Sequence, residues 1–239
     1  MSIEQIQIAN ITIDVLRKDI KNMHLAVYPP YGKVKVAVPG KTDLEVIRLF
    51  AISKYNWLKK NINSFQEQER EAEKKYINGE THYFLGRRYL LELQYGSNKH
   101  EVSLQGKKMI LHVRKGTSIR NRKFAVQEWY RNELKKVLLK MLPKWESKIG
   151  VKTNATNIKR MRTKWGSCNT QTKSILLNLE LAKKPIKCFE YILVHELIHL
   201  LERNHNNQFI AYMHEFMPTW QSHRDELNNL PVPHYDWGY

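Results

Sequence analysis

The chain contains little cysteine and no long apolar run, and each absence excludes a class of protein. Cys168 and Cys188 are the only cysteines among 239 residues, which argues against a disulfide-stapled fold and suits a reducing compartment. No apolar run reaches the roughly 18 residues of a membrane-spanning helix, so we expect no membrane partner. The first twenty residues include Glu4 and Asp14 and do not resemble a secretory signal. We therefore expect a cytoplasmic location.

Acidic residues are scarce relative to basic ones. Lysine and arginine number 40 and aspartate and glutamate 23, which gives a formal net charge of +17. The basic residues are densest between residues 99 and 164. Such a surface can attract nucleic acid, nucleotides or acidic protein segments. A solvated basic surface is the simpler interpretation and the one we favour, because no nucleic-acid-binding module is recognisable in the sequence.

The order of periodic patterns predicts an α+β fold. Period-two alternation characterises most of residues 1–118, with a single helical stripe between residues 42 and 62. We therefore predict a small, mostly-β amino-terminal region with one helix over residues 1–118. A helical domain with a small sheet should follow over residues 119–239. No internal repeat is visible in the sequence.

Local signals set the expected ends of these elements. A capping box led by Thr42 should begin the first helix. A long amphipathic helix should begin near Arg120, and Pro143 should kink or end it. Residues 174–181 alternate like a strand, and Pro185 follows where the next helix should start.

The strongest functional signal is an HExxH sequence within Val194–Leu200. Positions i and i+4 of an α-helix lie on one face about one turn apart, so His195 and His199 can bind the same zinc ion. Glu196 lies between them, where its carboxylate can take a proton from a metal-bound water. This spacing is typical of a metal-dependent hydrolase.

The surroundings of the motif strengthen this interpretation. Residues 189–201 contain no charged side chain besides Glu190 and Glu196. Histidine and glutamate buried in an apolar helix need partners, and a metal ion provides them. The alternative is a buried helix whose two histidines hydrogen-bond to backbone or carboxylate groups without a metal.

A third ligand is expected, because catalytic zinc has three protein ligands and keeps its fourth position open. His205, six residues after His199, is the leading candidate. An unbroken helix would carry His205 about 9 Å further along its axis, so the helix must end between the two histidines. We expect the exit at Arg203-Asn204, with Asn206 or Asn207 capping the next helix. Three downstream carboxylates are alternative ligands, namely Glu202, Glu215 and Glu226.

These residues resemble the active-site signature of the YgjP-like metallopeptidase family. The signature comprises the HExxH sequence, then His205 and Phe209. A second hallmark of the family, a basic segment leading into Trp-Gly-Ser-Cys, resembles residues 162–168. Less specific similarity reaches the amino-terminal half and extends the resemblance over nearly the whole chain, at Val36–Pro39, Trp57 and Leu85-Gly86.

The resemblance implies a zincin-like catalytic domain over residues 119–239, one Zn²⁺ ion held by three histidines, and a glutamate general base. It assigns the metal to His195, His199 and His205 and the base to Glu196. A strand just before the motif helix often borders the cleft of a zincin, so residues 174–181 could pair with an extended substrate.

One departure from the family concerns the pocket wall. The family commonly shows His-Ser and then Phe-Trp, whereas this chain has His205-Asn206 and Phe209-Ile210. The histidine ligand is kept, but the wall beside it can differ.

Residues in the second hallmark have open roles. Arg162 and Lys164 are possible substrate or oxyanion contacts, because a developing oxyanion needs a donor in addition to zinc. Cys168 is interpreted as a small packing residue, and Gly166 suggests a tight turn. Two histidines are further candidates for the oxyanion donor, His214 and His223.

Three functions are compatible with this site. The one we expect is a zinc-dependent metallopeptidase that hydrolyses a peptide or protein substrate through a metal-activated water, with Glu196 as general base. The alternative is a metal-dependent nucleotide pyrophosphatase whose basic residues attract phosphates, although a Walker-type glycine loop is absent. A nucleic-acid-associated module with structural zinc is the third, and an open coordination position argues against it.

Overall fold

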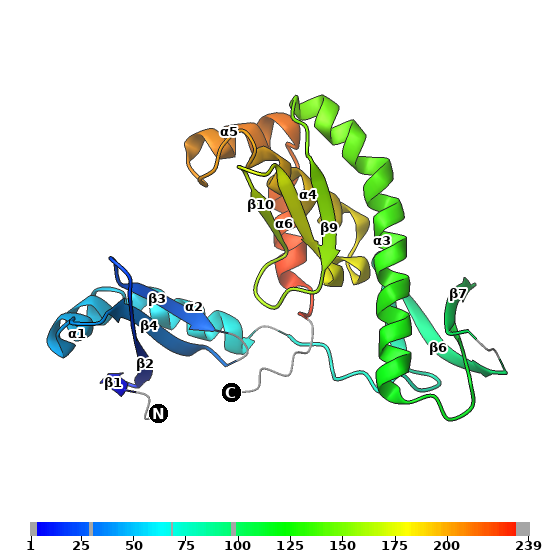
Figure 1. The fold of residues 1–239 in the computed structure, drawn as a ribbon, viewed down its shortest axis with the longest axis horizontal. Helices are drawn as coiled ribbons and strands as arrows, with labels where there is room; N and C mark the ends of the chain where they lie inside the picture. The colour runs from blue at the N-terminus through cyan, green and yellow to red at the C-terminus, as the bar shows by residue number, and fades with distance from the viewer. Residues whose placement is uncertain (1–3, 29–30, 68, 97–98, 233–239) are drawn as a thin grey trace. The chain divides into compact units, whose positions relative to one another are not determined.

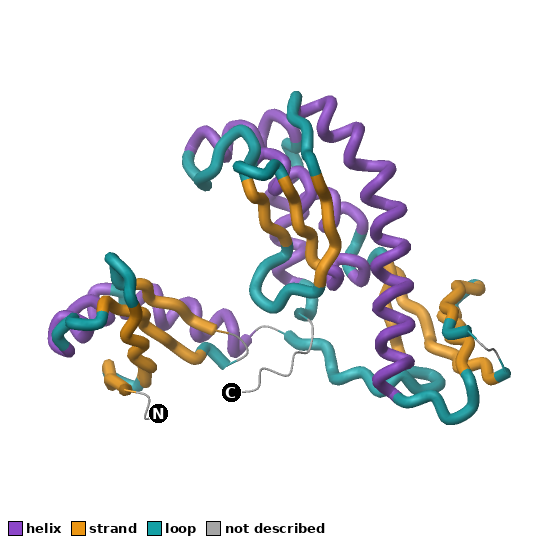
Figure 2. The backbone as a smooth tube through the Cα atoms, viewed as in Figure 1, coloured by secondary structure: helices purple, strands orange, loops and turns teal. Residues whose placement is uncertain are grey.

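A computed structural model describes residues 4–28, 31–67, 69–96 and 99–232 (Figures 1 and 2). These residues form two compact units, and the chain passes from the first to the second between Arg70 and Glu71. Both units combine strands with helices, and helices dominate toward the carboxyl end, which confirms the α+β class. The boundary expected between residues 118 and 119 lies inside the second unit, because the strands before it and the helix after it share one hydrophobic core.

The first unit is a four-stranded sheet with two helices. The strand order is β1-β2-β4-β3, in which β2 and β4 are parallel and the two outer pairs are antiparallel. Ile13, Val36 and Ile47 are fully buried where the sheet meets the helices. The elements are β1 (Glu4–Ile8), β2 (Ile11–Lys18), β3 (His24–Tyr28), β4 (Lys33–Pro39), α1 (Leu44–Ser53) and α2 (Tyr55–Glu67).

The single helix expected in this unit is divided into two. Lys54 leaves helical geometry, with φ −106° and ψ 9°, and separates α1 from α2. The cap of α1 is Asp43 rather than Thr42, because the Thr42 hydroxyl already donates to the Pro39 carbonyl at 2.9 Å. The Asp43 carboxylate accepts the Glu45 N–H at 2.7 Å.

The second unit begins with a sheet of the same topology. Its strand order is β5-β6-β8-β7, and again only the central pair is parallel. In both sheets the first hairpin turns through a non-glycine residue with positive φ, 50° at Ala9 and 48° at Leu85. The chain thus contains one four-stranded arrangement twice, a repeat that is not visible in the sequence. The elements are β5 (Thr81–Phe84), β6 (Arg87–Tyr95), β7 (Glu101–Gln105), β8 (Lys108–Val113) and the following helix α3 (Ile119–Ile149).

Helix α3 is long and passes through a proline. Its cap residues are Ser118 and Gly150, and Pro143 does not end it. Proline has no N–H, so the carbonyl of Leu139, one turn earlier, lacks its helical hydrogen-bond partner. Leu139 is 61% exposed, so water can satisfy this carbonyl. Leu138 and Trp145 are buried and keep the helix on the core on either side of the proline. No helix among the described residues has both the length and the apolar character needed to span a membrane.

A three-stranded sheet and three further α-helices complete the second unit. The strand order is β10-β11-β9, so β11 is central and β10 lies at an edge. The strand expected over residues 174–181 ends at Asn178, because the Asn178 side chain accepts the Glu180 N–H at 3.1 Å and begins a 3-10 helix. The elements are β9 (Ala155–Lys159), β10 (Gly166–Asn169), β11 (Ser174–Asn178), η1 (Leu179–Lys183), α4 (Ile186–Ile198), α5 (Asn207–Phe216) and α6 (Trp220–Asn229).

The turn between β5 and β6 fixes the start of α4. The N–H groups of Leu85 and Gly86 donate to the carbonyls of Ala182 and Lys183 at 2.8 and 3.3 Å. Gly86 has a φ of 79° and lies so close to Pro185 that a Cβ would be 3.0 Å from the Pro185 Cα. Pro185 immediately precedes α4, where the sequence predicted the helix to start.

Gly86→Ala should therefore destabilise the protein more than Gly79→Ala. Both glycines have a φ of 79°, so alanine costs about 1–2 kcal/mol of left-handed strain at either position. Only at Gly86 does the new methyl group also meet Pro185, since Gly79 has no atom within 4 Å of a built Cβ. Urea unfolding should show an additional loss of roughly 1 kcal/mol or more for Gly86→Ala. Equal losses in the free energy of unfolding for the two variants would mean that the contact between Gly86 and Pro185 does not fix the start of α4.

Candidate metal centre

Helix α4 carries the HExxH sequence at its carboxyl end. Most of its side chains are buried, including Phe189 and Leu193, and it packs against α3, α6 and the edge strand β10. Beyond its exposed first two residues the helix is buried on nearly all sides, which explains its apolar composition. His195 and His199 are only partly buried, because they lie where the helix ends. The motif therefore meets solvent only at this end of α4.

The chain reverses direction directly after α4. The helix ends with His199 as its C-cap, earlier than the exit expected at Arg203-Asn204. Asn206 caps α5, as expected, and its side-chain oxygen accepts the Phe209 N–H at 3.0 Å. The earlier end leaves the intervening residues free to form the turn that returns His205 to the helix.

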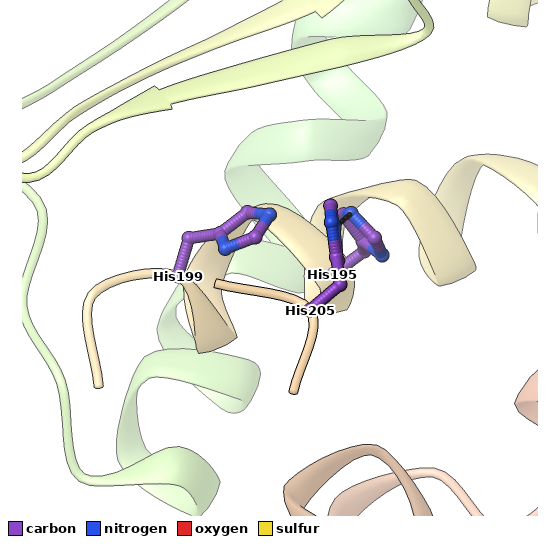
Figure 3. A group of neighbouring side chains, drawn as sticks. All are labelled: His195, His199 and His205. Atoms are coloured by element: carbon purple, nitrogen blue, oxygen red, sulfur yellow. Dashed lines mark hydrogen bonds between the residues drawn. The ribbon is translucent and has the colours of Figure 1, made fainter. Parts of the chain in front are cut away.

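Three imidazoles meet at this turn (Figure 3). The potential metal-binding atoms of His195, His199 and His205 all lie within 4.8 Å of one another. The Nε2 atoms of His195 and His205 are 3.0 Å apart. Two nitrogen atoms bound to one tetrahedral zinc at about 2.0–2.1 Å lie roughly 3.3 Å apart, so the three histidines have the dimensions of a metal site.

The Phe209 ring contacts all three imidazoles. Its centroid lies 5.0 Å from that of His195 and 4.8 Å from those of His199 and His205. Phe209 is 4% exposed and comes from the first turn of α5, which the Asn206 cap fixes. One buried ring thus limits the orientations of three side chains that come from two parts of the chain.

The surroundings of His195 and His199 favour the neutral imidazole, the form that binds metals. Burial lowers the pKa of His195 to about 3, with further contributions from His199 and His205. Burial also lowers the pKa of His199. Nδ1 of His199 lies 3.1 Å from the Glu202 carbonyl, which can only accept, so Nδ1 carries the proton and Nε2 is left for a metal.

Glu196 is buried beside the histidines. It is 5% exposed, and burial raises the pKa of its carboxyl group to about 8, while the charge of Lys164 acts in the opposite direction. The carboxyl group lies against Gly166, where a Cβ would be 2.5 Å from Oε1. Gly166 begins β10 and does not have positive φ, so the glycine provides space for Glu196 and does not form the tight turn that we expected.

A cleft of about 560 Å³ opens at the histidines and Glu196. Its lining includes β10 with the residues that follow, Gly166–Gln171, and Arg203 from the turn after α4. Residues 174–181, which we expected at the border of the cleft, do not line it. Strand β11 is paired on both sides, whereas β10 is paired with β11 alone among the described strands. The sheet edge at the cleft is therefore β10.

The residues of the second hallmark separate into two groups. Lys164 and Cys168 line the cleft, whereas Arg162 is exposed and outside its lining. Burial, together with the charge of Glu196, raises the pKa of the Cys168 thiol to about 11. A thiol of this kind stays protonated near neutral pH and is a poor nucleophile.

The other residues considered as ligands or donors lie outside the cluster of three histidines. The Glu202 carboxylate accepts the Asn204 N–H at 2.9 Å. Glu226 pairs with Lys187 at 3.0 Å. The three alternative carboxylates and the two histidines considered as donors do not belong to the cleft lining. They are Glu202, Glu215, Glu226, His214 and His223.

Asn178 holds the segment that carries Lys164 and Gly166. It is 4% exposed, and its Nδ2 donates to the carbonyls of Met161 and Lys164 at 2.9 and 2.7 Å. Its Oδ1 accepts the N–H groups of Met161 and Glu180 at 3.3 and 3.1 Å. One buried amide thus joins the segment before β10 to η1. Sequence reasoning missed it, because a single asparagine at a strand end belongs to no motif.

Comparison with known proteins places this geometry in a family. A family model described as the YgjP-like metallopeptidase domain matches residues 21–230. Among solved structures, the crystal structure of the metallopeptidase zymogen of Pyrococcus abyssi abylysin is similar with a TM-score of 0.35 and 18% identity, over 38% of this chain and 90% of that chain. No curated protein matches the chain. Because the family match covers most of the chain, including α4 and β10, the chain belongs to the YgjP-like metallopeptidase family.

Proposed function

We propose that the protein is a zinc-dependent peptidase in which Glu196 is the general base and His195, His199 and His205 are the metal ligands. The convergence of the three histidines within 4.8 Å, beside a buried carboxyl group of the same helix, carries this proposal. Family membership makes the protein a metal-dependent hydrolase, and our proposal adds zinc and the residue roles. We place the activity in the cytoplasm, since Cys168 is free and a reducing compartment suits it.

The donor set fits zinc at a catalytic site. Imidazole nitrogen is a preferred zinc ligand, and three protein ligands leave one coordination position for solvent or substrate. The Glu202 carbonyl accepts a hydrogen bond from His199 and so orients its ring. Histidine ligands of zinc are commonly held by a hydrogen bond of this kind. A zinc ion supplies Lewis acidity, which lowers the pKa of water and polarises a carbonyl group.

Glu196 is placed to move the proton. Its carboxyl group lines the cleft and lies against Gly166. We assign to the ionised form of Glu196, which the charge of a bound zinc ion would favour, the uptake of a proton from the attacking water and its delivery to the leaving amine. A base held in one position by a buried helix avoids the misalignment that a mobile side chain would bring.

Strand β10 is our candidate for aligning the substrate. An extended peptide can add to a free sheet edge through main-chain hydrogen bonds, and its alternate side chains then face the protein. β10 borders the cleft and is paired with β11 alone among the described strands. We therefore propose an extended peptide or an unfolded protein segment as the substrate, bound at β10 and not at residues 174–181.

Glu196→Gln should abolish peptide hydrolysis while the protein keeps its metal. The amide has the size of the carboxyl group but accepts no proton, so we expect kcat to fall about 10²–10⁴-fold. The assay uses unfolded proteins and quenched peptide libraries, with metal content measured on the same samples. Nucleoside triphosphates are tested in parallel. The wild type could instead cleave no peptide and release phosphate or pyrophosphate, with that release lost in Glu196→Gln. This result would favour the pyrophosphatase function over the peptidase function.

His205→Ala should lose zinc, and His24→Ala should keep it. His205 provides one of three donors, so its removal should weaken zinc binding by more than the roughly 10–100-fold that a lost outer partner costs. His24 lies in β3 of the first unit and is the matched histidine control. Elemental analysis after dialysis against a competing chelator measures the retained metal. Full retention by His205→Ala would remove His205 from the ligand set.

Gly166→Ala should lower kcat without unfolding the protein. A Cβ at this position would be 2.5 Å from Oε1 of Glu196, so the carboxyl group must move. Displacement of a catalytic group by about 1 Å can cost about 10²-fold in rate. Gly40→Ala is the control, because Gly40 has no positive φ and no atom within 4 Å of a built Cβ. Wild-type kcat in a Gly166→Ala protein with normal zinc content would contradict the role of this contact.

A further inference from the structure

The cleft at the three histidines has an excess of positive charge. Lys164 and Arg203 line it, and Glu196 is the one acidic residue of its lining within the described part of the chain. Lys164 comes from the segment before β10, and Arg203 comes from the turn between α4 and α5. Two separate parts of the chain thus contribute a cation to one cleft.

Neither cation forms a close ion pair with a residue of the described chain, although Lys164 interacts with Glu196 electrostatically. Both side chains are exposed, and neither forms a salt bridge within the described part of the chain. Nearby cations in the same unit behave differently, since Arg160 pairs with Glu180 at 3.1 Å and Lys183 pairs with Glu71 at 2.9 Å. Lys164 and Arg203 are therefore available to an anionic group that enters the cleft.

The rest of the lining offers polar side chains and no large apolar side chain among the described residues. Recognition of an apolar side chain needs a concave surface of hydrophobic or aromatic residues. No leucine, isoleucine, valine, phenylalanine or tryptophan is part of the lining within the described residues. Charge and hydrogen bonding are therefore the strongest means by which these side chains can distinguish substrates. The neutral polar residues of the lining are Ser167, Asn169, Thr170 and Gln171.

We infer that the cleft selects peptides that carry an aspartate or glutamate within two residues of the bond to be cleaved. This inference rests on the proposed peptidase function and names its substrate class. Arg203 can bind a carboxylate through two parallel hydrogen bonds, and Lys164 supplies a compact charge with three donors. Both interactions stabilise a negative side chain more than a neutral amide of the same size.

The positions of the two cations limit where the acidic side chain binds. A peptide paired with β10 advances about 3.3 Å per residue, and its successive side chains face opposite sides. Lys164 lies two residues before Gly166, the residue in contact with Glu196, and Arg203 lies two residues before His205. Because both side chains line the cleft that holds the histidines and Glu196, we expect them to meet substrate positions close to the reacting bond.

A second role for Arg203 makes a different kinetic prediction. A donor to the reacting oxygen would assist every substrate, so its loss would lower kcat for acidic and neutral peptides alike. Recognition of a substrate carboxylate instead affects kcat/KM for acidic peptides, mainly through KM. Pairs of peptides that differ only by glutamate and glutamine separate the two roles.

The experiment uses quenched peptides in which one glutamate is moved through the two positions on each side of the cleaved bond, each with a glutamine counterpart. We expect the wild type to prefer glutamate at least about tenfold in kcat/KM for one or more positions, and the preference to shrink at high salt. Lys164→Gln and Arg203→Gln should each reduce the preference, and the double variant should remove it. Lys140→Gln is the control, because Lys140 is exposed on α3 and outside the cleft.

Each outcome bears on one of the two proposals. Equal rates for glutamate and glutamine peptides would overturn the selectivity and leave the peptidase function intact. An equal loss of kcat on both peptides in Arg203→Gln, with zinc content unchanged, would overturn the recognition role of Arg203. A wild type that cleaves no peptide would instead overturn the proposed function itself.

Discussion

The close approach of β10 to α4, where Gly166 meets Glu196, is the contact on which the site depends. A Cβ at Gly166 would lie 2.5 Å from the carboxyl oxygen, so no side chain fits between the strand and the helix. The same contact places a buried carboxyl group at the histidines and, as far as the described strands show, an unpaired strand edge at the cleft. Glycine usually weakens a strand because it packs nothing. Here the missing side chain allows two elements to meet, and Asn178 secures the segment that leads into the contact.

The second four-stranded sheet helps to position the helix that takes part in the contact between Gly166 and Glu196. Both sheets have one parallel central pair and a first hairpin with a non-glycine residue at positive φ. In the second sheet, that hairpin binds the carbonyls of Ala182 and Lys183 and lies against Pro185. It thereby sets where α4 begins, and the histidines lie at the opposite end of the same buried helix. The strain of Leu85 at a φ of 48° is tolerated where the surrounding contacts determine the conformation.

Features determined by neighbouring residues could be predicted from the sequence, and those that depend on contacts distant in the chain could not. The start of α4 after Pro185 and the cap at Asn206 depend on a few adjacent residues, and both predictions are confirmed. The edge position of β10 depends on which strands pair, so residues 174–181 were wrongly expected at the cleft. The sequence named Arg162 and Lys164 alike as possible contacts and did not point to Arg203, because the packing of α4 and its turn decides which side chains line the cleft.

The net charge of +17 indicates a function only where the fold places basic side chains in a cleft. Exposed lysines on α3, such as Lys140, are surrounded by water, and a pair formed there is worth little. Lys164 and Arg203 border a cleft of about 560 Å³, where a peptide bound as we propose would displace water from the charges and strengthen their attraction for an acidic side chain. The charge of Lys164 also lowers the pKa of Glu196, which opposes the effect of burial. In the complex that we propose, an acidic substrate residue near Lys164 would offset that effect and would thereby couple the charge of the substrate to the basicity of Glu196.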